Sequence, residues 1–230
     1  MFDQINIIAF DLDDTLWPCM PTIERAEEAL YSWLSYHCPR ITSRYSRENM
    51  LESRRQFTLQ DRRYGVDLSL MRREFLRKLA QEAGYDPDPV AQQAFEVFYL
   101  ARQEVDFYDD VFPVLERLRR RYRLGAISNG NANVERVGLG HLIEHSVNAA
   151  ELQIAKPDKL IYQCLAERFG VRVEQILYVG DHPEYDVVGP LEAGLHAVWM
   201  NREDKDWPDH FAPPQYQIRN LDELELLLTA

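Results

Sequence analysis

The sequence is poor in cysteine and lacks long apolar runs. Its three cysteines, Cys19, Cys38 and Cys164, are scattered without CxxC spacing, which argues against a disulfide framework and against a zinc site. No stretch approaches the roughly 18 apolar residues that a membrane-spanning helix needs. The opening residues, MFDQINIIAF, also lack the basic leader of a signal peptide. These absences predict a globular protein that is cytoplasmic and has no membrane partner.

Positive charge is scarce as well. The 230 residues include 38 acidic and 26 basic side chains, so the formal net charge is −12. Such a surface repels nucleic acid, and we expect no nucleic-acid partner. It would also repel a phosphorylated substrate unless a divalent cation and one or two cationic side chains reverse the field locally. Any lysine with a chemical role comes from a short list, namely Lys78, Lys156, Lys159 and Lys205.

Short apolar runs alternate with helical patterns over much of the chain. Strands are predicted over residues 5–10, 124–128, 146–149, 176–180 and 196–200, and helices over 111–122, 132–139, 157–169, 187–193 and 224–228. Alternation of this kind is typical of a parallel sheet covered by helices on both faces. The predicted fold class is therefore α/β, with a Rossmann-like parallel sheet as its core.

The hydrophobic pattern changes after the first strand. From about residue 21 to residue 100 apolar side chains recur with a helical period and no convincing strand is present. The sequence thus predicts a discontinuous core, residues 1–16 and 107–230, interrupted by a helical insert, residues 17–106.

Polar residues end three of the predicted strands. Asp11 and Asp13 follow the first strand, Ser128 and Asn129 end the second, and Asp181 follows a later one. Ligands of open parallel sheets bind outside the carboxyl ends of the strands, so these groups should converge on one crevice. Each pair alone could be a plain turn, because Asp, Ser and Asn are common in turns.

The acidic groups suggest a division of chemical labour. Side chains two positions apart in an extended segment point to the same side, so the Asp11 and Asp13 carboxyls should both face the crevice. Like charges at that distance tend to raise one pKa, which suits one ionised nucleophile and one acid. Asp11 and Asp181 could bind Mg²⁺, which takes one or two protein carboxylates, while Asp186 could bind it indirectly or orient a lysine.

Ser128, Asn129 and Lys156 are candidate ligands of an anion. The first two offer a hydroxyl, an amide and loop N–H groups, and Lys156 precedes a proline that is predicted to open a helix. The non-functional alternatives are that Ser128 and Asn129 only form a turn and that Lys156 is a solvent-exposed cation.

Four segments together resemble the motifs of the haloacid dehalogenase (HAD) superfamily: FDLDDTL at 10–16, ISNGN at 127–131, AKPD at 155–158 and VGDHPEYD at 179–186. The insert resembles the helical cap domain of that family. The resemblance implies a Mg²⁺-dependent phosphatase that forms an aspartyl-phosphate. Asp11 would be the nucleophile and Asp13 the general acid and base. Metal ligands would be Asp11, Asp181 and the main-chain oxygen of Asp13. Ser128, Asn129 and Lys156 would bind phosphate. Asp186 would contact Lys156 or the water ligands of the metal.

Two other functions remain open at this stage. The family's dehalogenases, which act on small 2-haloacids, use the same nucleophile but lack the acidic residue two positions later, and Asp13 occupies that position here. A non-catalytic binding module would have no need of the whole set. Within the family, the segment from Asn129 to Gly140 and the size of the insert are similar to bacterial 5-amino-6-(5-phosphoribitylamino)uracil and flavin mononucleotide phosphatases. We therefore expect a small-molecule phosphorylated substrate, and a monomer or small homo-oligomer.

Overall fold

The computed structural model describes residue 2 and residues 4–229, and the chain forms two compact units. The first unit ends at Pro18 and resumes at Asp106, and the second spans Cys19–Val105. Among the described residues, none of the helices combines the length and the hydrophobicity required to cross a bilayer.

The first unit is built on a six-stranded parallel sheet with strand order β3-β2-β1-β4-β5-β6. The central strand β1 is completely buried, as expected of a strand covered on both faces. Its last residue, Phe10, lies opposite Ala126 of β2 and Val179 of β4, so these three strands end at the same edge. The strands are β1 (Ile7–Phe10), β2 (Arg123–Ser128), β3 (His145–Asn148), β4 (Ile176–Gly180), β5 (His196–Met200) and β6 (Gln217–Ile218).

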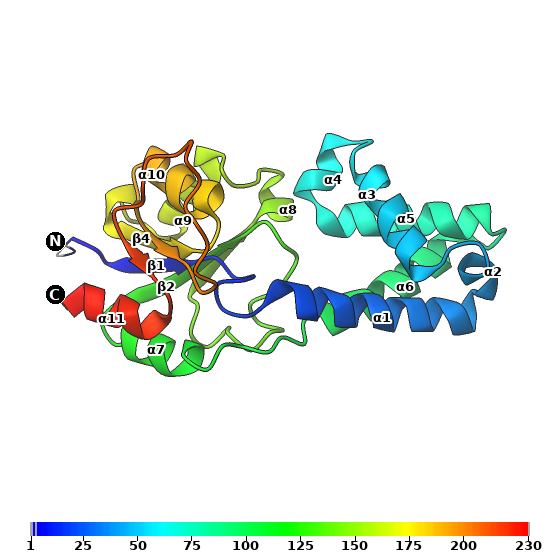
Figure 1. The fold of residues 1–230 in the computed structure, drawn as a ribbon, viewed down its shortest axis with the longest axis horizontal. Coiled ribbons are helices and arrows are strands. Elements are labelled where there is room, and N and C mark those ends of the chain that lie inside the picture. Colours follow the sequence, from blue (N-terminus) through cyan, green and yellow to red (C-terminus); the bar gives the residue numbers. More distant parts are fainter. Residues whose placement is uncertain (1, 3, 230) are drawn as a thin grey trace. The chain divides into compact units, whose positions relative to one another are not determined.

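Helices cover both faces of this sheet. In Figure 1, α9 and α10 lie above the strands and α7 and α11 below them. The helices of this unit are α7 (Val111–Leu118), α8 (Ala149–Leu152), α9 (Lys159–Phe169), α10 (Gly189–Ala193) and α11 (Leu221–Thr229), with a 3₁₀ turn η1 (Val173–Gln175) and a π-helix η2 (Pro183–Val188).

Several of the predicted helices differ from the structure. The helix predicted over 111–122 ends at Leu118, α10 begins at Gly189 after the π-helix, and α11 begins at Leu221. Residues 132–139 form a series of turns instead of a helix, because Gly138 takes a φ of 96°, which ends the turn that starts at Asn133. Helix α9 begins at Lys159 and not at Pro157, since the Asp158 carboxylate caps it by accepting a hydrogen bond from Leu160 N.

The second unit is entirely helical over its described residues. Helix α1 packs against α6, and α6 packs against α5, around a core that includes Leu30, Phe75 and Phe98. The helices are α1 (Cys19–His37), α2 (Pro39–Thr42), α3 (Arg47–Thr58), α4 (Arg62–Val66), α5 (Leu68–Glu82) and α6 (Pro87–Arg102). The predicted fold class, an α/β core with a Rossmann-like parallel sheet and an inserted helical region, is confirmed.

The chain leaves and re-enters the first unit at adjacent points. Tyr108 N donates a hydrogen bond to Leu16 O at 3.1 Å, and the Trp17 and Phe107 rings meet edge to face with centroids 5.3 Å apart. The two segments that connect to the helical unit are therefore held together by the sheet unit itself.

Candidate active site

A cavity of about 190 Å³ opens at the carboxyl edge of β1, β2 and β4. The register explains why residues far apart in the sequence meet here, since Asp11, Ser128 and Asp181 all stand at or just beyond strand ends. All seven side chains that the sequence singled out line this cavity: Asp11, Asp13, Ser128, Asn129, Lys156, Asp181 and Asp186.

Lys156 lies at the centre of the buried part of the site. Its Nζ is 2.7 Å from Asp11 Oδ1 and 2.6 Å from Asp186 Oδ1. The Tyr178 hydroxyl accepts a third hydrogen bond at 3.1 Å and donates its own hydrogen to Ile127 O at 3.0 Å. A lysine ammonium has three hydrogens, so these three acceptors saturate it.

The charges at this centre shift each other's protonation. Burial raises the pKa of Asp11 well above its usual value; Lys156 opposes this shift, and Asp186 and Asp181 add to it. Burial alone would lower the pKa of Lys156, but Asp11 and Asp186 outweigh it, and the pKa is raised. The carboxylates that act most strongly on Asp11 thus come from other parts of the chain, and not from Asp13 as the sequence analysis assumed.

Two hydrogen bonds fix Asp181 beside Lys156, one to its main chain and one to its side chain. The indole of Trp199, in β5, donates a hydrogen bond to Asp181 O at 2.7 Å, and Thr15 Oγ1 lies 3.4 Å from Asp181 Oδ1. Burial, followed by the charges of Asp186 and Asp14, raises the pKa of Asp181 to about 7. Without a cation, this carboxyl is only half ionised near neutral pH.

The carboxylates fit a divalent metal ion. Oxygen atoms of Asp11, Asp181 and Asp186 all lie within 4.8 Å of one another, and hard oxygen donors are what Mg²⁺ prefers. Asp186 uses both of its oxygens, one for Lys156 Nζ and the other for His182 N at 2.9 Å. Asp11 and Asp181 are therefore better placed to bind a cation than Asp186.

Gly180 allows Asp186 to come this close to the strand end. A Cβ at position 180 would lie 2.4 Å from Asp186 Cγ, a distance that real Cβ contacts do not show. The π-helix η2 carries Asp186 back over the end of β4, and π-helical segments are frequent at functional sites. The glycine and the π-helix together bring the Asp186 carboxylate onto Lys156.

The side chain of Asn129 forms two hydrogen bonds with the main chain of Lys156. Its Oδ1 accepts from Lys156 N at 2.8 Å and its Nδ2 donates to Lys156 O at 3.1 Å. Ser128 Oγ accepts from Gly130 N at 2.9 Å, which leaves its O–H as a donor toward the cavity. An anion at this end of the cavity therefore meets the Ser128 hydroxyl, whereas the Asn129 amide holds Lys156 in place.

Asp13 lies in the loop that follows β1, and its carboxyl group is bonded by a tryptophan from the same loop. The buried Trp17 donates its indole N–H to Asp13 Oδ1 at 2.9 Å. Asp14, with a φ of 59°, turns the loop so that its own N–H bonds Trp17 O at 2.7 Å.

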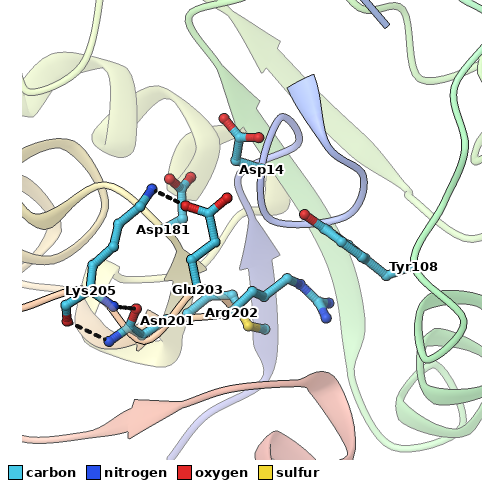
Figure 2. Close-up of a pocket in the computed structure, with 8 residues that line it drawn as sticks. Asp14, Tyr108, Asp181, Asn201, Arg202, Glu203 and Lys205 are labelled. Carbon is cyan, nitrogen blue, oxygen red and sulfur yellow. Dashed lines mark hydrogen bonds and ion pairs between the residues drawn. The ribbon is translucent and has the colours of Figure 1, made fainter. Parts of the chain in front are cut away.

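A second, smaller hollow lies on another side of Asp181 (Figure 2). Arg202 runs along it: its Nε donates to Thr15 O at 2.9 Å, and its Nη2 lies 3.0 Å from Asp110 Oδ2. The guanidinium also stacks over the Tyr108 ring, 4.0 Å from its centroid. Figure 2 also shows the Lys205–Glu203 ion pair, at 2.7 Å, in the same hollow.

Three supporting residues were missed by sequence reasoning: Tyr178, Trp199 and Arg202. A weak signal existed only for Tyr178, a hydroxyl in the otherwise apolar strand ILYVG. Trp199 and Arg202 act on segments that lie far away in the sequence, and no local pattern marks them.

Comparison with known proteins identifies the family of the chain. The chain is 28% identical to the 5-amino-6-(5-phospho-D-ribitylamino)uracil phosphatase YigB of Escherichia coli, over 98% of this chain and 97% of that protein. It is 28% identical to a glyceraldehyde 3-phosphate phosphatase of Methanopyrus kandleri, over 90% and 92%. A crystal structure described as a 2-haloacid dehalogenase of Pseudomonas syringae superposes with a TM-score of 0.91 at 36% identity, covering 98% of both chains. Residues 5–194 match the family model of the haloacid dehalogenase-like hydrolases, and the chain belongs to that family.

Proposed function

We propose that this hydrolase is a Mg²⁺-dependent phosphatase that cleaves a small phosphomonoester through an aspartyl-phosphate on Asp11. The observation that carries the proposal is the position of Asp13 in the same cavity as Asp11, Lys156 and Asp181. A nucleophile, a proton donor, a cation and a metal ligand are the groups that phosphoryl transfer requires.

The first half-reaction uses the two aspartates of the β1 loop. An Asp11 carboxylate oxygen attacks phosphorus and forms a new O–P bond, while the bond from phosphorus to the ester oxygen breaks. The electron pair of that bond goes to the ester oxygen, which takes a proton from Asp13 and leaves as an alcohol. Lys156 can follow the transfer, because the hydrogen that it donates to Asp11 can turn to a phosphoryl oxygen.

The second half-reaction restores the enzyme. Asp13, now ionised, takes a proton from a water molecule whose oxygen attacks phosphorus, and the bond between phosphorus and Asp11 breaks. Inorganic phosphate leaves and both aspartates return to their starting states. The Ser128 hydroxyl and Lys156 bind the phosphoryl oxygens in both steps, with the lysine held by Asn129 and Asp186.

The charge balance of the cavity supports a metal requirement. Once Asp11 is ionised, as its attack on phosphorus requires, Asp11, Asp181 and Asp186 bring more negative charge to the cavity than the ammonium of Lys156 balances, and this excess would repel a phosphate dianion. Mg²⁺ bound by Asp11, Asp181 and the main-chain oxygen of Asp13 would neutralise this excess and favour the ionised form of Asp11.

Dehalogenation of a 2-haloacid is the competing function, because the superposed Pseudomonas syringae structure carries that description. A halide leaves without a proton, so a dehalogenase has no use for Asp13. A 2-haloacid is itself an anion, and in the absence of a cation it would meet the same excess of carboxylates. Both arguments favour phosphoryl chemistry.

We propose that the helical unit, Cys19–Val105, acts as the cap that selects the substrate. Its aromatic side chains include Trp33 and Tyr31, which pack against the core of this unit and stay half-buried. The case for a pyrimidine or flavin phosphate therefore rests mainly on the relative YigB, which is named for a phosphoribitylaminouracil substrate. A panel of nucleotides, sugar phosphates and flavin mononucleotide, ranked by kcat/KM, tests this assignment.

The decisive experiment measures phosphate release from p-nitrophenyl phosphate with and without Mg²⁺. The wild type should need the metal, and Asp11→Asn should lose at least about 10³-fold in kcat, because it removes the nucleophile. Asp209→Asn, the same substitution at an exposed position outside the cavity, is the matched control. Halide release from 2-chloropropionate without metal, together with silence toward every phosphomonoester in the panel, would overturn the proposal.

A further inference from the structure

Trp17 is fixed more firmly than a linker residue needs to be. Its side chain is completely buried although it lies only two residues before the helical unit begins. The loop that carries it is closed by Leu16 N on Leu12 O at 2.8 Å and by Asp14 N on Trp17 O at 2.7 Å. Its ring stands edge-on to Phe107, with the ring planes at 90°. The indole therefore has one orientation, set by contacts on several sides.

That orientation aims the indole N–H at Asp13 Oδ1, 2.9 Å away. An indole N–H can only donate, so it fixes Oδ1 as an acceptor. The torsion that turns a carboxyl group is broad and roughly two-fold, and a carboxyl without such an anchor is poorly oriented. With Oδ1 anchored, the proton that reaches a leaving alcohol is carried on Oδ2.

We infer that Trp17 is a positioning residue for the general acid, which holds the Asp13 carboxyl in the orientation that protonates the leaving group. This inference rests on the proposed phosphatase function and extends it to a residue outside the four sequence motifs. The transfer itself is unchanged: the bond from phosphorus to the ester oxygen breaks, and that oxygen takes the proton from Asp13 Oδ2.

The leaving group provides a test that packing alone would not satisfy. An alkoxide is a strong base and needs a proton as it departs, whereas p-nitrophenolate departs readily without one. The value of kcat/KM covers the steps up to the departure of the alcohol and excludes the later attack of water. A residue that orients the acid should therefore matter more for kcat/KM on alkyl phosphates than on aryl phosphates.

The experiment compares kcat/KM of the wild type, Trp17→Phe and Asp13→Asn on p-nitrophenyl phosphate and on the best alkyl phosphate of the substrate panel. Trp17→Phe keeps a ring against Phe107 but removes the N–H. We expect it to lower kcat/KM on the alkyl ester by at least about tenfold more than on the aryl ester, in the direction set by Asp13→Asn. Trp207→Phe also removes an indole N–H, one that is bonded to Phe211 O outside the cavity, and as the matched control it should show no such difference.

A second variant guards against a folding defect in Trp17→Phe. Phe107→Leu keeps the indole but removes the ring that supports it, and it should give a smaller difference of the same sign. Equal losses on both esters, or an alkyl kcat/KM that does not fall, would overturn the inference while phosphatase activity stands. Absence of Mg²⁺-dependent phosphate release in the wild type would instead remove the proposed function, and this inference with it.

Discussion

The Tyr178 hydroxyl lies 3.1 Å from Lys156 Nζ and supplies the third acceptor that the buried ammonium needs. Of the other two acceptors, Asp11 is the proposed nucleophile and Asp186 also bonds His182 N, whereas Tyr178 takes no part in the proposed chemistry. The tyrosine sits in the middle of β4, so the sheet holds the tip of the lysine side chain while Asn129 holds its main chain.

Tyr178→Phe should leave one hydrogen of Lys156 and the oxygen of Ile127 without their bonds. We expect the free energy of unfolding to fall by about 1–3 kcal/mol, since both groups are buried. Phosphate binding should weaken as well, because the lysine loses its fixed position. Urea unfolding and KM for p-nitrophenyl phosphate measure the two effects. Tyr162→Phe, which removes a hydroxyl bonded to Tyr185 O, is the control: it should lose stability without the change in KM.

Asp186→Asn should be more damaging. It removes one of the two carboxylates that hold the pKa of Lys156 up, and it places an amide where both oxygens accept hydrogen bonds. We expect a loss of about 3–5 kcal/mol in the free energy of unfolding and a 10- to 100-fold loss of activity. Asp206→Asn, at an exposed site, should change neither. Full activity in Asp186→Asn would show that Lys156 does not depend on this carboxylate.

Mg²⁺ should bind more tightly as the pH rises. The pKa of Asp181 is about 7 in the metal-free protein, and the ion binds the ionised carboxylate, so binding releases a proton below that pH. A raised carboxyl pKa also means that the metal-free protein loses stability between about pH 4 and pH 7 as the pH rises. The increase in Tm caused by Mg²⁺ should therefore be larger at pH 8 than at pH 6. An equal increase at both values, or one that persists in Asp181→Asn, would contradict this assignment.

Arg202→Lys should loosen the region where the chain leaves and re-enters the sheet unit. A lysine keeps the charge near Asp110 but cannot bond Thr15 O at the same time, and it loses the planar stack on Tyr108. We expect the free energy of unfolding to fall by about 1–3 kcal/mol in urea titrations. Arg219→Lys, in an exposed pair with Asp204, should change it by less than about 0.5 kcal/mol.

The sequence was informative where a local pattern decides the structure. The buried strand 176–180 is an apolar run that ends in an acidic residue, and its boundaries are those predicted. The cluster at the strand ends followed from the geometry of parallel sheets, since three strands in register must end at one edge. These two rules predicted the convergence of the cavity residues and five of the six strands; the two-residue edge strand β6 (Gln217–Ile218) was not predicted.

Other features depend on contacts between distant segments, which no local pattern records. The Asn129 amide looked like an anion ligand because nothing in its neighbourhood shows that it pairs with the main chain of Lys156. The role of Trp17 depends on Asp13 and on Phe107, which lies at the far end of the insert. The helix predicted over 132–139 failed because the left-handed φ of Gly138 outweighed the periodicity.

The hydrogen bond from Tyr108 N to Leu16 O affects how the inserted segment can change in evolution. Because the sheet unit closes its own ends, the inserted segment resembles a long loop whose two ends are already joined, and the entropy of loop closure grows only slowly with loop length. A segment of another size or composition could be exchanged there without disturbing strand register. New chemical preferences could then arise by grafting, while the machinery at the strand ends stays intact.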